Sequence, residues 1–77
     1  MNDKKRTKLT EAVSLIRQAS SIVRSVCSDE EDSMDRLPEN MEDSALHERM
    51  EAAVDELDSA SDDLESAIDH IESAKSV

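Results

Sequence analysis

Residues 46–74, LHERMEAAVDELDSASDDLESAIDHIESA, decide the fold of this chain. Their apolar positions recur at alternating steps of four and three: Leu46, Met50, Ala53, Leu57, Ala60, Leu64, Ala67, Ile71 and Ala74. This heptad spacing is typical of a helix that packs against a second helix along one seam. From Met50 onward each large seam residue is followed three positions later by alanine. The predicted seam is therefore coiled-coil-like and rich in alanine, which lets two backbones approach closely.

A second periodic pattern in the same stretch is made of acidic residues, which we call the acidic stripe. Its members are Glu51, Asp55, Asp58, Asp62, Glu65, Asp69 and Glu72. The steps are again four and three, and we assign the stripe to the helix face opposite the seam. One interpretation is a solvated outer face that keeps a small coil soluble. The other is an interaction surface for a basic partner.

Four members of the acidic stripe are expected to contribute most to partner binding, because they lie mid-helix and far from the basic residues of the first helix. They are Asp55, Asp58, Asp62 and Glu65. The whole stripe spans about 32 Å at helical rise, close to the ~34 Å turn of B-DNA. The spacing therefore also permits the hypothesis of an acidic DNA mimic.

Composition restricts the chain to a small, all-α, acidic protein. The 77 residues include no Gly, Phe, Trp or Tyr, and 20 acidic residues against 9 basic ones give a net charge of −11. A chain this short has a marginal core by itself. The charge argues against direct binding to nucleic acid or to an anionic membrane, and it favours a basic protein surface. A single cysteine, with no apolar run of ~20 residues, predicts a cytoplasmic protein.

The chain is predicted to form one domain, residues 1–77, built as an antiparallel two-helix hairpin. We expect a first helix over residues 4–36, a connection over 37–43 and a second helix over 44–76. Pro38 disfavours helical geometry at the residue before it and so ends the first helix, although residues 28–36 are also compatible with a loop. Caps are expected at Asn2 or Asp3 and at Asp43 or Ser44. The seam of the first helix is predicted to contain Leu9, Ala12, Ile16, Ala19, Val23 and Val26.

Two registers of the hairpin match large seam residues with small ones. In the first, the numbers of paired residues sum to 83, so that Ile16 meets Ala67. In the second, they sum to 76. The two differ by one heptad, and the sequence leaves both open.

Five apolar residues flank the predicted seams and are expected to remain partly exposed in a two-helix hairpin. They are Val13, Leu15, Ile22, Val54 and Ile68. An apolar face wider than one partner helix covers is typical of a bundle. We therefore predict self-association, as a homodimer that forms a four-helix bundle.

No catalytic, cofactor or metal constellation is predicted. The acidic run 29–32 lacks the EF-hand pattern, and His47 and His70 do not stand in the Glu-x-x-His arrangement of carboxylate-bridged bundles. Cys27 is predicted to be a small buried apolar residue without a nearby base. We expect a chain that is not an enzyme and holds neither a cofactor nor a metal.

Residues 35–44, DRLPENMEDS, followed by residues 50–57, MEAAVDEL, resemble a family of small acidic helical proteins found in bacteriophages and bacterial mobile elements, most of them uncharacterised. The resemblance implies a helical hairpin and a mobile-element setting. Because small acidic phage proteins often bind host proteins, it also favours an inhibitor, for example one with an anti-defence role. It implies no activity and no site residues.

The sequence thus predicts a non-enzymatic protein–protein interaction module that binds and modulates a host protein with a basic surface. One alternative is an acidic nucleic-acid mimic that inhibits a host defence or DNA-binding protein. Another is a structural or assembly subunit of a larger complex.

Overall fold

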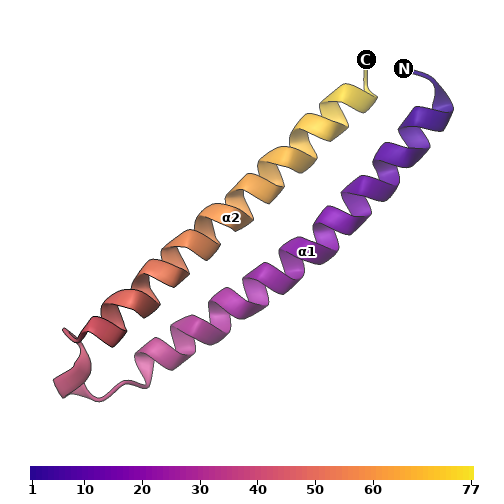
Figure 1. The fold of residues 1–77 in the computed structure, drawn as a ribbon. Coiled ribbons are helices and arrows are strands. Elements are labelled where there is room, and N and C mark those ends of the chain that lie inside the picture. The colour runs from indigo at the N-terminus through magenta and orange to yellow at the C-terminus, as the bar shows by residue number, and fades with distance from the viewer.

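The computed structural model describes all 77 residues and consists of two long helices joined by a short connection. Helix α1 spans Asp3–Asp35, the 3-10 helix η1 spans Glu39–Met41 and helix α2 spans Ala45–Lys75. The two α-helices run antiparallel side by side, so both termini lie at one end and η1 at the other (Figure 1). The predicted all-α antiparallel hairpin is confirmed.

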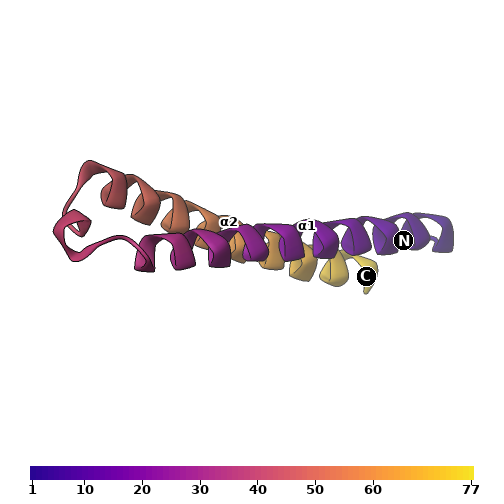
Figure 2. The same cartoon turned by 90° about the horizontal axis from the view of Figure 1, so that it is seen from below.

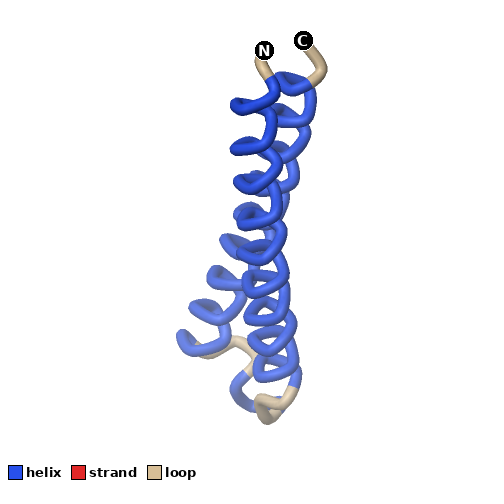
Figure 3. The backbone as a smooth tube through the Cα atoms, turned by 90° about the vertical axis from the view of Figure 1, so that its right-hand side faces the viewer, coloured by secondary structure: helices blue, strands red, loops and turns tan.

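The hairpin is a rod with extents of 59 × 15 × 12 Å. Seen from below, α1 and α2 cross at a shallow angle near their middles, as expected for helices that pack along a heptad seam (Figure 2). A view along a third direction shows two uninterrupted helices, with loops only at the termini and at the connection (Figure 3). Neither helix has the apolar length that a membrane crossing requires.

Both α-helices begin at caps among those that the sequence predicts. The side chain of Asn2 accepts a hydrogen bond from the backbone N–H of Lys5 at 2.9 Å. The hydroxyl of Ser44 accepts one from the N–H of His47 at 3.1 Å. These contacts satisfy amides that a helix start leaves unpaired.

The acidic segment at the end of α1 is helical, and the helix ends two residues before Leu37. The backbone N–H of Arg36 still donates to the carbonyl of Asp32 at 3.2 Å. Pro38 follows in an extended conformation, with ψ of 150°. The loop alternative for residues 28–36 is therefore wrong, and the proline sets the end of the helix as predicted.

The seam that the structure buries differs at alternate positions from the predicted one. The five buried residues are Val13, Ser20, Cys27, Val54 and Ile68. The predicted seam residues Ala19 and Val26 are exposed, and Leu46 is 39% exposed. In α1 the true seam is Leu9, Val13, Ile16, Ser20, Val23 and Cys27, which keeps the steps of four and three.

The shift has a physical reason in the size of the competing side chains. Moving the seam by one residue at alternate positions replaces three predicted alanines by Val13, Val54 and Ile68. These branched side chains remove more apolar surface from water than alanine does. The same shift admits Ser20 and Cys27, so the observed seam is less uniformly apolar than the predicted one.

The burial of these side chains corrects the prediction for the flanking residues. Val13, Val54 and Ile68 were expected to remain partly exposed, but only 6%, 7% and 3% of their surfaces are accessible. They hold the two helices of one hairpin together. Leu15 and Ile22 are exposed as predicted.

Contacts of Cys27 distinguish the two predicted registers. Its Sγ atom lies 3.8 Å from the carbonyl oxygen of Val54 and 3.6 Å from Oδ1 of Asp58. The register that sums to 83 places Cys27 opposite Glu56, midway between these contacts, whereas the register that sums to 76 places it opposite Arg49. The observed register is the first one. The predicted layer of Ala19 and Leu64 is not formed, because Ala19 is exposed, whereas Ala60 and Ala67 of the other layers are half-buried.

Candidate functional site

The acidic stripe runs along the border of the helix–helix interface. The seam of α2 takes the same steps of four and three, with Ser61 in place of Ala60: Met50, Val54, Leu57, Ser61, Leu64, Ile68 and Ile71. Every member of the acidic stripe follows one of these residues by one position. One residue turns a helix by about 100°. The stripe therefore occupies one flank of α2, and the predicted placement on the face opposite the seam is wrong.

Contacts along the stripe divide its members into paired and unpaired carboxylates. Arg24 Nη2 lies 2.9 Å from Oε1 of Glu65, and Arg24 Nε donates to Ser61 Oγ at 3.2 Å. Two members contact basic residues of α2 itself: Glu72 lies 3.5 Å from Lys75, and Glu51 lies 3.9 Å from Nδ1 of His47. Glu65 was expected to lie far from the basic residues of the first helix, and this expectation is wrong.

Three members of the stripe have no ion pair and no hydrogen bond from a side chain. They are Asp55, Asp62 and Asp69, all exposed. They stand seven residues apart, two helical turns from one to the next. These three unpaired carboxylates are therefore regularly spaced along α2, and Asp58, which contacts only the Cys27 thiol, has no basic partner either.

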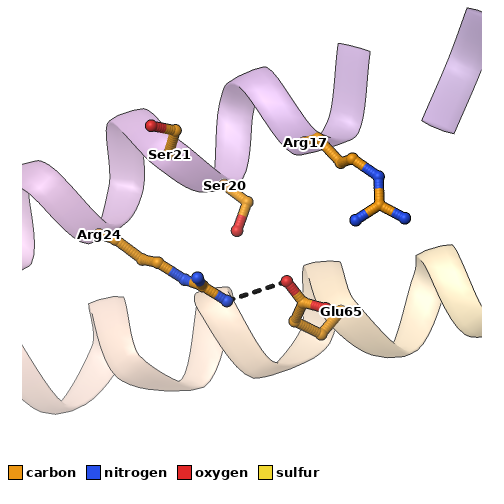
Figure 4. A pocket seen from close by; sticks show the side chains of 5 residues that line it. All are labelled: Arg17, Ser20, Ser21, Arg24 and Glu65. Atoms are coloured by element: carbon orange, nitrogen blue, oxygen red, sulfur yellow. Dashed lines mark hydrogen bonds and ion pairs between the residues drawn. The ribbon is translucent and has the colours of Figure 1, made fainter. Parts of the chain in front are cut away.

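A small hollow of about 240 Å³ lies on this flank, beside basic residues of α1. It is lined by Arg17, Ser20, Ser21, Arg24 and Glu65. The hydroxyl of Ser20 lies between the two arginine side chains, and Arg24 reaches across to Glu65 (Figure 4). Ser20 Oγ is buried without a hydrogen-bond partner. Sequence reasoning missed Arg17 and Arg24, although their seven-residue spacing places them on one side of α1.

Nearer the connection, both helices contribute acidic residues around the buried thiol. Cys27 Sγ lies 3.6 Å from Oε1 of Glu31 and 3.6 Å from Oδ1 of Asp58. Burial, followed by the charges of and hydrogen bonds to Asp58 and Glu31, raises the pKa of Cys27 to about 11. The thiol is therefore protonated at neutral pH, and its single S–H hydrogen can be donated to Glu31, to Asp58 or to the carbonyl of Val54.

The ligand atoms of Cys27, Glu31 and Asp58 lie within 4.8 Å of one another. Metal ions and electrophiles both react with the thiolate form of a cysteine. The raised pKa of Cys27 disfavours the thiolate. In the structure, the cluster is a hydrogen-bonded thiol. His47 and His70 do not join it, because they lie on α2, roughly 35 Å apart along the helix axis.

The acidic flank of the hairpin thus has two parts with different charge. Around Asp58 it gains Glu31 of α1, while around Glu65 it gains Arg17 and Arg24. The unpaired carboxylates Asp55 and Asp62 lie on either side of Asp58 along α2.

No protein-family model, characterised protein or solved structure matches this chain.

Proposed function

We propose that the chain is a non-enzymatic protein–protein interaction module whose acidic stripe binds a basic surface of a host protein and modulates that protein. The observation that carries the proposal is the row of unpaired, exposed carboxylates at Asp55, Asp62 and Asp69. A solvated face needs only scattered charges of both signs. This flank instead concentrates one sign along one rigid helix, with basic residues only beside Glu65 and at its two ends.

The physical properties of the stripe suit recognition of a basic partner. The helix fixes the carboxylates, so little conformational entropy of the main chain is lost on binding. Their combined field accelerates encounter with a positively charged surface, and salt weakens that effect. The protonated Cys27 thiol supports a role without covalent chemistry, because the attacking species of a cysteine nucleophile is the thiolate.

The resemblance to small acidic proteins of bacteriophages and mobile elements supports a bacterial host protein as the partner. The single cysteine supports the cytoplasm as the setting. In that setting the module acts as an inhibitor, including the anti-defence kind. Blocking a basic surface by occupancy requires only affinity, which a chain of 77 residues can supply without an active site.

A charge-matched pair of variants tests the proposal. The first variant, Asp55→Asn with Asp62→Asn, removes two unpaired carboxylates from the stripe. The second, Glu56→Gln with Asp63→Asn, removes the same charge from the adjacent positions, which lie about 100° further round α2. Bacterial proteins retained by the immobilised parent chain are compared with those retained by each variant across a salt series.

We expect a retained protein that the stripe variant loses, that the matched control keeps, and that salt elutes. Substituting asparagine also removes repulsion between neighbouring acids, so the helix content of the stripe variant stays at the parent level or rises slightly. Equal retention by both variants, with no salt dependence, would assign the stripe to solubility alone.

A nucleic-acid mimic is the second candidate function, and the length of the stripe favours it. From Glu51 to Glu72 the carboxylates cover about 32 Å of helix, which compares with the ~34 Å turn of B-DNA. The partner would then be a defence or DNA-binding protein. Duplex DNA added as a competitor should displace the chain from such a partner. Salt-sensitive binding that DNA does not compete supports the acidic module and rejects the mimic.

We also propose that the hairpin self-associates into a four-helix bundle. Leu15 and Ile22, which are 57% and 66% exposed, support this proposal because they form no part of the core of the single hairpin. Replacing both with Glu should give monomers in sedimentation experiments. Ser14→Glu with Ser21→Glu is the matched control, since it adds the same charges at the same spacing on the other flank of α1.

A further inference from the structure

Four exposed apolar residues of α1 and the half-buried Ala12 form one continuous row, which we call the apolar stripe. Its members are Ala12, Leu15, Ala19, Ile22 and Val26. The steps are three and four, so the row is straight along the helix. Leu15, Ile22 and Val26 are 57%, 66% and 49% exposed, so about half or more of each residue remains open to solvent in the single hairpin. The row continues into Lys8 at one end and Asp29 at the other.

The apolar stripe and the acidic stripe lie on opposite sides of the hairpin. Residues of the acidic stripe follow the seam residues of α2 by one position. Arg24 follows the seam residue Val23 of α1 by one position, and it forms an ion pair with Glu65 of the acidic stripe. The residues that follow the seam residues of α1 and those that follow the seam residues of α2 therefore lie on the same side of the hairpin. The apolar stripe precedes the seam of α1, so it shares the other side with the residues that precede the seam of α2. These include Ala53, Ala60, Ala67 and Ala74.

The amount of exposed surface fits a missing copy of the same chain. The hairpin exposes 5625 Å² at a mass of 8.6 kDa. A compact monomer of that mass exposes about 4,700 Å². The excess of about 900 Å² is close to the ~800 Å² that each partner buries in a standard protein–protein interface.

We propose that the apolar stripe packs against the apolar stripe of a second copy with the two α1 helices antiparallel and Ala19 near the two-fold axis. The stripe is self-complementary in that arrangement. Leu15 faces Ile22 of the second copy, and Ala12 faces Val26 of the second copy. At the two ends, Lys8 faces Asp29 of the second copy. Such an interface is isologous, so each of these contacts occurs twice.

This arrangement deepens the self-association proposed above and is independent of what the acidic stripe binds. It places the two acidic stripes on the outer sides of a four-helix assembly. The like charges of the two copies are thereby kept apart, although each chain carries −11. The dimer presents two equivalent acidic surfaces, and it is bivalent toward a basic partner.

Cysteine substitutions along the apolar stripe test the geometry in the full-length chain. In the antiparallel arrangement, Ala19→Cys brings two thiols together at the axis and forms a disulfide under mild oxidation. Val26→Cys leaves its two thiols about 21 Å apart along the axis and does not cross-link with itself. A mixture of Val26→Cys and Ala12→Cys chains should cross-link. The parent chain, which keeps Cys27 buried, is the control for background oxidation.

Charge reversal at the ends of the stripe gives a second, reversible measurement. Lys8→Glu should raise the dimer dissociation constant in sedimentation about tenfold, a change of about 1.4 kcal/mol, because it places Glu beside Asp29 of the second copy. Combining it with Asp29→Lys should restore the parent value. Lys8 and Asp29 are exposed, and their side chains form no ion pair within the hairpin, so circular dichroism of each variant should match that of the parent.

Each outcome decides the proposal. Cross-linking of Ala19→Cys but not Val26→Cys, with restoration by the double charge swap, supports it. Self-cross-linking of Val26→Cys overturns the antiparallel geometry. A dimer whose dissociation constant is unchanged by either charge reversal also overturns it. A monomeric parent overturns both this proposal and self-association, and it leaves the binding function of the acidic stripe standing.

Discussion

The Sγ atom of Cys27 in α1 lies 3.6 Å from Oδ1 of Asp58 in α2. This contact joins residues 31 positions apart and fixes the register of the hairpin. It also shows that the acidic stripe reaches the edge of the core, because Cys27 is buried. A carboxylate beside a buried thiol favours the protonated thiol, since ionisation would place two negative charges next to each other.

The first prediction concerns the reactivity of this thiol. Burial, Asp58 and Glu31 raise the pKa of Cys27 from 9.0 to about 11, so alkylation by iodoacetamide should be slow at pH 8 and increase up to about pH 11. Asp58→Asn should lower the midpoint of the rate profile, whereas Asp62→Asn, which is not in contact with the thiol, should leave it unchanged. A midpoint near 9 in the parent chain would contradict the described environment.

The same shift predicts loss of stability at alkaline pH. The folded-state pKa lies above the unfolded value, so the contribution of the protonated thiol is complete below about pH 9 and is lost as the pH rises toward 11. Urea midpoints of the parent should therefore fall across this window. Cys27→Ala, which does not ionise, should show a smaller fall over the same pH range.

Most of the fold follows from local sequence signals that do not contradict one another. Pro38 is the only proline, and the two heptad patterns stand on either side of it. Ser44 stands two residues before Leu46, where the second periodic stretch begins, Asn2 stands seven residues before Leu9, where the first begins, and each caps a helix. Because these signals agree, the two long helices, their ends to within one residue and their antiparallel direction were predictable, whereas the 3-10 helix η1 was not predicted.

The position of the seam was not predictable from spacing alone. Ala53 and Val54 both continue a pattern of fours and threes through Met50 and Leu57, as do Ala67 and Ile68 between Leu64 and Ile71. Spacing alone does not decide which of two such neighbours is buried. The decision depends on which side chain better fills the space between the two helices. The error moved the acidic stripe to the wrong face and hid the contact between Arg24 and Glu65, since both depend on which flank borders the interface.

A further prediction concerns the buried hydroxyl of Ser20, which has no hydrogen-bond partner. Ser20→Ala removes this uncompensated polar group and should stabilise the hairpin by about 1 kcal/mol beyond the gain in helix propensity. Ser14→Ala, at an exposed position of the same helix, measures the propensity gain alone, roughly 0.5 kcal/mol. Equal effects of the two substitutions on the urea midpoint would show that the Ser20 hydroxyl is satisfied in solution.

The ion pair between Arg24 and Glu65 should contribute little to stability despite its 2.9 Å separation. The two side chains are 60% and 46% exposed, and exposed pairs contribute about 0.2–1 kcal/mol. A double-mutant cycle with Arg24→Gln and Glu65→Gln should give a coupling energy in that range, which decreases in 1 M salt. A coupling energy well above it, unaffected by salt, would mean that the pair is buried by a second copy or a partner.

The last prediction separates the observed seam from the predicted one. Ile68 is 3% exposed, so Ile68→Ala should cost about 2–5 kcal/mol, a large share of the stability of a small domain. Ile68→Val, which removes one methyl group, should cost about 0.5–1.5 kcal/mol and keeps the experiment measurable. Leu46, a member of the predicted seam, is 39% exposed, and Leu46→Ala should cost less than Ile68→Ala by at least about 1 kcal/mol. Thermal and urea unfolding followed by circular dichroism give both values. A larger loss from Leu46→Ala than from Ile68→Ala would mean that the hairpin in solution packs through the alanine-rich seam instead.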